Sequence, residues 1–225
     1  MSLGRDTASS QRARNSWRGL ALLLALECCI AVTAYRSSAA AAETTDAFVS
    51  AFNEACVGER KSFVGAVAHA QKNGWSVVSP LSHAQLAGVM QKSADGMAQG
   101  KAEGYVTQFA HETLSKIVSG RPVYLVVSLT QSDIFDQIGC YLYDFDATAP
   151  IDRGAVTRLL KIEPANVIED ATIVSAVWGP PPKATGRLDT YLTYIPAGSP
   201  HAAKTGFTGV VLKTTSAAPK GTGKS

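Results

Sequence analysis

Four histidines are the residues of this chain best suited to acid–base chemistry or metal binding. His69, His83, His111 and His201 lie in separate segments, and no two have the spacing that places paired metal ligands on one helix face. His69 lies off the apolar stripe of its helix, so we expect it to be exposed. No Gly-x-Ser-x-Gly elbow is present to mark a nucleophile. The sequence favours a non-catalytic protein without a cofactor. A hydrolase-like enzyme that uses His111 or His83 with a nearby carboxylate is the alternative.

A run of aspartates between residues 133 and 152 could supply the oxygen ligands that calcium prefers. Read as an EF-hand loop from Asp144, the run has alanine at its sixth and twelfth positions, where that loop needs glycine and glutamate. Strand alternation also places Asp144 on the same face as Cys140, which is unusual for a carboxylate. We predict turn and helix-capping roles and no metal site for these residues, which are Asp133, Asp136, Asp144, Asp146 and Asp152.

The segment APKGTGKS at residues 218–225 matches a relaxed P-loop pattern. A P-loop follows a strand and opens a helix, whose N-terminal amides hold the phosphates. We do not expect a helix after this segment, and we expect an exported protein to meet little ATP. We therefore predict no nucleotide binding, and interpret residues 215–225 as a disordered tail of small and polar side chains.

Residues 1–42 have the three-part pattern of a secretory leader. A basic stretch is followed by an apolar run at residues 19–34 and by small residues at 37–42. The run carries Glu27 near its centre and is shorter than the span of about 20 residues that a membrane anchor needs. We expect cleavage of the leader. An uncleaved leader that tethers the protein to the membrane and lipid attachment at Cys28 or Cys29 are the alternatives.

Removal of the leader leaves two cysteines, Cys56 and Cys140. An even pair of cysteines in an exported chain is most simply explained by a disulfide. This bridge would join the first helix to a central strand and stabilise the fold by roughly 4 kcal/mol through closure of a long loop. The alternative is two separate buried thiols that act as small apolar side chains.

Charge in the rest of the chain is balanced. The whole sequence has 21 basic and 18 acidic residues, but five arginines and only two acidic residues lie in the leader. The remainder lacks the clustered basic surface that is typical of nucleic-acid-binding proteins. We predict no nucleic-acid partner. The expected partner is a protein or a small molecule in the cell envelope, with membrane contact only through an uncleaved leader.

Helical and strand patterns occur in blocks. Helical spacing begins at Thr44 and recurs over residues 61–72, and Ser82 and Asp152 are placed to cap two later helices. Residues 93–104 contain three glycines and are predicted to form a flexible loop. Strands are predicted at residues 75–78, 105–109, 113–118, 123–129, 138–145, 171–178, 188–195 and 207–214, with a helix over residues 110–118 as the alternative there.

This order predicts a single α+β domain over residues 43–214, with an antiparallel sheet of about five or six strands and helices packed on one face. Tyrosines alternate along two of the strands, so some must lie off the core face and could form a binding surface. Core packing is the favoured role for them and for Trp75 and Trp178. The tyrosines are Tyr141, Tyr143, Tyr191 and Tyr194. The sequence thus predicts an exported, periplasmic or secreted, domain that binds a partner without catalysis.

Overall fold

A single antiparallel sheet organises the chain. The computed structural model describes residues 44–58, 62–133, 135–180 and 186–219. The expected leader and the last part of the expected tail lie outside these residues. The sheet has eight strands in the order β1-β2-β3-β4-β8-β7-β6-β5, and every neighbouring pair is antiparallel. The α+β class and the antiparallel sheet are therefore confirmed, but the sheet is larger than the predicted five or six strands.

The strand bounds show where the predicted segments and the observed strands differ. The strands are β1 (Ser76–Val77), β2 (Gln108–Val118), β3 (Arg121–Gln131), β4 (Phe135–Asp144), β5 (Asn166–Glu169), β6 (Val174–Trp178), β7 (Arg187–Ile195) and β8 (Gly209–Pro219). The two segments predicted around residues 105–118 form one continuous strand, β2. Strand β5 was not among the predicted strands. Its four residues are all exposed at the sheet edge, and a strand without a buried face lacks the alternation of apolar and polar residues that identifies strands in a sequence. Strand β8 continues to Pro219, so the prediction of a disordered tail is wrong for residues 215–219.

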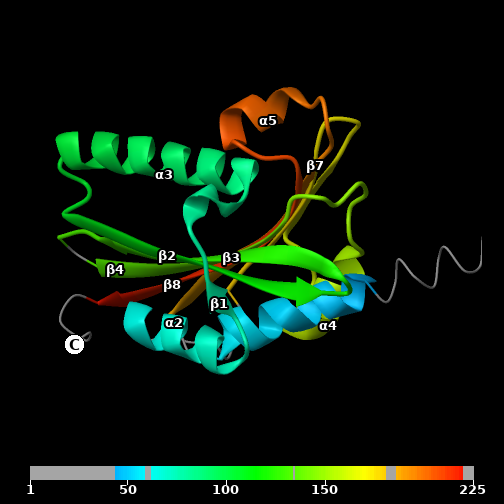
Figure 1. The fold of residues 1–225 in the computed structure, drawn as a ribbon, viewed down its shortest axis with the longest axis horizontal. Helices are drawn as coiled ribbons and strands as arrows, with labels where there is room; N and C mark the ends of the chain where they lie inside the picture. The colour runs from blue at the N-terminus through cyan, green and yellow to red at the C-terminus, as the bar shows by residue number, and fades with distance from the viewer. Residues whose placement is uncertain (1–43, 59–61, 134, 181–185, 220–225) are drawn as a thin grey trace, which may run out of the picture. The chain divides into compact units, whose positions relative to one another are not determined.

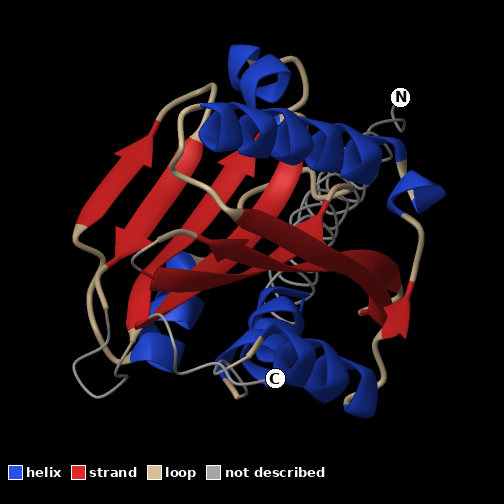
Figure 2. Ribbon diagram, turned by 90° about the vertical axis from the view of Figure 1, so that its left-hand side faces the viewer, coloured by secondary structure: helices blue, strands red, loops and turns tan. Residues whose placement is uncertain are grey.

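Helices cover both faces of the sheet, which corrects the prediction of helices on one face only (Figure 1; Figure 2). One face carries the helix that begins at Thr44 and ends in the π-helical turn η1 (Asn53–Val57), together with α2 (Phe63–Lys72) and α4 (Arg153–Leu160). The other face carries α3 (Ala84–Ala102) and the short α5 (Pro200–Thr205). Six consecutive residues of β3, 123–128, are buried because helices lie on both sides of that strand.

Each helical layer has its own apolar core. Beneath the sheet, Phe52 of the first helix and Val156 of α4 pack against Leu125, Leu142 and other strand residues. Above the sheet, Leu86, Val89 and Met90 of α3 pack against a cluster of aromatic side chains. That cluster comprises Tyr124, Tyr143, Phe145 and Phe207, with ring centroids 5.1 to 6.4 Å apart. Burial of apolar surface on both faces stabilises the sheet as a central layer.

Helix α3 is longer than predicted. It continues through residues 93–102, where three glycines in the segment 93–104 favoured a loop. Gln91 donates a hydrogen bond to Asp95 four residues later, and Gln99 donates to Glu103 in the same way, which supports the exposed face of the helix. Packing of this helix on the sheet therefore outweighs the cost of glycine in its interior.

Local capping bonds set where several helices begin. Asp152 accepts a hydrogen bond from the Gly154 amide and caps α4, as predicted. The residue that caps α3 is His83, whose Nδ1 accepts from the Gln85 amide, and not the predicted Ser82. Helix α5 was not predicted; its Ser199 cap precedes a proline, a common arrangement for a helix start.

Candidate functional site

The two cysteines that remain after the expected leader form a disulfide, as predicted. Cys56 lies in η1 and Cys140 in β4, and their Cα atoms are 5.6 Å apart. Both side chains are buried in the core beneath the sheet. The bridge therefore joins the first helix to a central strand and is a structural link rather than an exposed redox site.

The four histidines are not brought together. His83 caps α3 and stacks on Phe145, with ring centroids 4.8 Å apart. His111 is exposed on β2 beside Phe109, and His201 lies in the first turn of α5. Among the described residues, neither His83 nor His111 makes a hydrogen bond to a carboxylate or a hydroxyl group. The pair required by the alternative enzyme hypothesis is therefore not formed by these residues.

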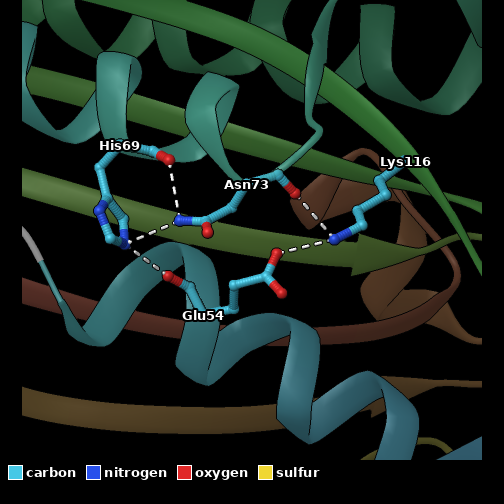
Figure 3. A network of polar contacts seen from close by, with 4 residues as sticks. All are labelled: Glu54, His69, Asn73 and Lys116. Atoms are coloured by element: carbon cyan, nitrogen blue, oxygen red, sulfur yellow. Dashed lines mark hydrogen bonds and ion pairs between the residues drawn. The ribbon is translucent and has the colours of Figure 1, made fainter.

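His69 is half-buried, so the expectation that it is exposed is wrong. Its Nε2 lies 2.8 Å from the Glu54 carbonyl oxygen and 3.2 Å from Asn73 Nδ2, which also donates to the His69 carbonyl at 2.9 Å. The Lys116 ammonium donates to the Glu54 carboxylate at 2.7 Å and to the Asn73 carbonyl at 2.9 Å (Figure 3). It also lies 5.9 Å from the ring centroid of Trp75. His69 Nε2 either donates to the Glu54 carbonyl or accepts from Asn73 Nδ2, according to its tautomer. The network fastens η1 and α2 to β2, so it is a brace between elements.

Asp144 lies on the core-facing side of β4, where an ion pair with Arg121 compensates its charge. Its carboxylate is 2.7 Å from the Arg121 guanidinium, and its other oxygen accepts from the Asp146 amide. Burial raises the pKa of Asp144, and Arg121 opposes this shift. No three His, Cys, Asp or Glu side chains within the described ranges are grouped to hold a metal ion.

A cavity that can accept a small molecule lies between α3 and strands β2 to β4. We call it the α3 cavity; its volume is about 200 Å³. Val89, Met90 and Met97 of α3 form its roof, Phe109 of β2 closes one side, and Val126 of β3 lies below. Figure 1 shows α3 lying across these strands. Most of the wall is therefore apolar, and two methionines make it adaptable in shape.

Hydroxyl groups line the floor of the α3 cavity. Ser128 and Thr130 extend from β3, and Tyr141 and Tyr143 from β4. Burial raises the pKa of Tyr141, and a hydrogen bond with Ser128 lowers it by less. Burial and the neighbouring Tyr141 raise the pKa of Tyr143. Both phenols therefore stay protonated at neutral pH, and the Tyr143 hydroxyl makes no hydrogen bond to a described residue.

The mouth of the cavity is formed by α3. Lys92 and Gly96 line the cavity and are also exposed to solvent. A Cβ added to Gly96 would meet no atom within 4 Å, so glycine leaves this part of the cavity open. A larger side chain at residue 96 would enter space that is now empty.

Only the β4 side of this site was predicted from the sequence. The tyrosines of β4 were singled out because they alternate along a strand. The residues of α3 at 93–97 were missed because their glycines favoured a loop. A small-residue helix with methionines at positions 90 and 97, seven apart, was the signal that could have revealed the roof.

No known protein family, curated protein or solved structure matches this chain. Within the part of the chain that the structure describes, no helix is long and apolar enough to cross a membrane. The chemistry of the α3 cavity is therefore the basis for a functional proposal.

Proposed function

We propose that this protein is an exported, non-catalytic domain that binds a small, mainly apolar molecule in the α3 cavity. The observation that carries the proposal is the cavity itself, which combines an apolar wall with several hydroxyl groups on one side. Small-molecule sites commonly have this composition, because burial supplies affinity and a few polar groups fix the orientation of the ligand.

The size of the cavity limits the ligand. A cavity of about 150 Å³ lined by apolar side chains can take up benzene or xenon. The α3 cavity, at about 200 Å³, matches a single ring or a short chain rather than a drug-sized molecule. The free hydroxyl of Tyr143 can donate a hydrogen bond to an oxygen atom of such a ligand.

Export is supported by two features of the sequence and fold. The leader pattern at residues 1–42 is the first, and the Cys56–Cys140 disulfide is the second, since disulfides persist mainly in oxidising compartments. Intact-mass measurement of the protein recovered from outside the cytoplasm tests this part. We expect loss of about 40 residues, as leaders of this type are removed, and of two hydrogen atoms. A full-length, reduced chain confined to the cytoplasm would contradict it.

Thermal unfolding in the presence of toluene tests the cavity. We expect toluene to raise the melting temperature of the wild-type protein in a saturable manner, because a ligand that binds only the folded state stabilises it. In Gly96→Leu the added side chain occupies the cavity, so the response should be lost. This variant should itself be at least as stable as wild type, since replacing an interior helix glycine favours the helix by up to about 1 kcal/mol.

Ala98→Leu is the matched control. Residue 98 lies on the exposed side of α3 and does not line the cavity, so this variant adds a leucine to the same helix without filling the site. It should respond to toluene like the wild type. Equal responses in Gly96→Leu and Ala98→Leu, or no saturable response in the wild type, would overturn the proposal.

A further inference from the structure

Lys213 of β8 is the neighbour of Tyr141, a residue of the α3 cavity wall, and it has no charged partner among the described residues. In the sheet register it is opposite Tyr141 of β4 on one side and Tyr191 of β7 on the other. Residues that are directly opposite in neighbouring strands share a face, so Lys213 extends from the same face as Tyr141, which lines the cavity.

The environment of the Lys213 ammonium favours an anion. The nitrogen lies 4.6 Å from the ring centroid of Tyr191, and the side chain is half-buried. Burial lowers the pKa of Lys213, which shows that the charged form is incompletely solvated. No carboxylate of the described residues forms an ion pair with it. The nearby Asp189 accepts a hydrogen bond from the Tyr191 hydroxyl at 3.2 Å.

A second lysine stands at the mouth of the same cavity. Lys92 of α3 lines the cavity and is exposed. Its Cδ lies 3.1 Å from the position of a Cβ added to Gly206, so the side chain leans toward the segment that leads into β8. Lys92 also forms no ion pair within the described residues. The chain outside the expected leader has balanced charge. Two lysines without an ion pair among the described residues, one lining the cavity and one next to Tyr141 in its wall, are therefore a local feature.

We propose that the ligand of the α3 cavity is an amphipathic carboxylate, whose ring-sized apolar group fills the cavity and whose carboxylate binds Lys213, with Lys92 contributing from the mouth. This inference rests on the proposed function and adds the charge of the ligand to it. An ammonium that is already partly removed from water loses little further solvation when it pairs, so the pairing is more favourable than at a fully exposed site.

Calorimetric titration of the exported protein at low ionic strength tests the proposal with two probes that differ only in the acid group. The probes are 3-phenylpropionate and its neutral counterpart, 3-phenylpropan-1-ol. We expect the acid to bind about tenfold more tightly than the alcohol, and this preference to fall as salt is added. Lys213→Met should remove the preference, and Lys213→Arg should retain most of it. Lys92→Met should reduce it only two- to threefold, roughly the effect of an exposed charge.

The variants and the two probes separate failure of this inference from failure of the proposed function. Methionine keeps the unbranched apolar stem of lysine, so Lys213→Met should fold normally and melt at or above the wild-type temperature. If both probes bind equally in wild type and Lys213→Met, but not in Gly96→Leu, the carboxylate proposal is wrong and the cavity proposal stands. If the acid binds equally in wild type and Gly96→Leu, the acid is held outside the cavity and both proposals fail. Binding of neither probe to the wild type also rejects both.

Discussion

The ring of Tyr141 lies directly over Gly139, two residues earlier on the same face of β4. A Cβ added to Gly139 would lie 2.6 Å from the Ser128 hydroxyl oxygen and 2.7 Å from the Tyr141 phenol oxygen, closer than real Cβ atoms approach. Glycine at residue 139 therefore allows Tyr141 to reach Ser128 across the strand and to form part of the cavity floor.

Gly139→Ala should displace the Tyr141 ring from its place over the strand. We expect a loss of about 1–3 kcal/mol in the free energy of unfolding, because an added methyl group in packed surroundings forces its neighbours to move. Toluene binding should weaken at the same time, since Tyr141 lines the α3 cavity. Urea unfolding and the toluene-dependent melting shift measure the two effects. Gly179→Ala is the control, because its added Cβ meets no atom within 4 Å; equal effects at both positions would contradict the prediction.

Removal of the disulfide should destabilise the fold substantially. The double variant Cys56→Ala/Cys140→Ala is expected to lose about 2–5 kcal/mol, because the unfolded chain regains the freedom of an open loop between residues 84 apart in sequence. Urea unfolding with and without dithiothreitol measures the effect. The reductant should lower the midpoint of the wild-type protein and leave that of the double variant unchanged. A wild-type midpoint insensitive to complete reduction would argue against this role.

Arg121→Met should destabilise the protein in a pH-dependent manner. The Asp144 carboxylate is buried, and its pKa is already raised by burial; without Arg121 that pKa rises further. An ionised Asp144 then costs stability at neutral pH. This cost decreases as the pH falls from the raised pKa to the unfolded value of about 4, and below that value the group is protonated in both states.

We expect a loss of about 2–3 kcal/mol at pH 7 and a much smaller one near pH 4, measured by urea unfolding at both values. The estimate is below the 3–5 kcal/mol that is typical for breaking a fully buried pair, since Arg121 is 37% exposed. Adding Asp144→Asn to Arg121→Met removes the titrating group. If the penalty in the double variant still changes between pH 7 and pH 4, the assignment to Asp144 is incorrect.

The two buried tryptophans should respond differently to the same substitution. Trp75 and Trp178 are 2% and 0% exposed. The Trp178 indole donates to the Thr157 hydroxyl at 3.1 Å, whereas the Trp75 indole nitrogen has no hydrogen-bond partner among the described residues. Both Phe variants lose a similar amount of buried surface, but only Trp178→Phe loses a hydrogen bond. We expect Trp178→Phe to be more destabilising by about 1–2 kcal/mol in urea unfolding. An equal or larger loss in Trp75→Phe would show that its indole N–H has a partner.

Features that depend on a local pattern, or on a simple count of residues, can be predicted from the sequence alone. The disulfide partners followed from counting cysteines, and the Asp152 cap followed from a preferred residue type at a helix start. The central strands β3 and β4 were found because their apolar runs are rich in β-branched and aromatic residues. The cap and strand signals lie within a few residues of one another, and the disulfide needs only a count of cysteines, so none of them requires knowledge of the fold.

The tertiary structure decided which segments meet, and with them the candidate site. Whether helices cover one or both faces of the sheet depends on connections between distant elements, and so does the pairing of Asp144 with Arg121. The polar second half of α3 is helical because it packs on the sheet. The stabilisation from this packing cannot be inferred from its glycine-containing sequence. The α3 cavity exists only where that helix and three strands leave a space that their side chains do not fill.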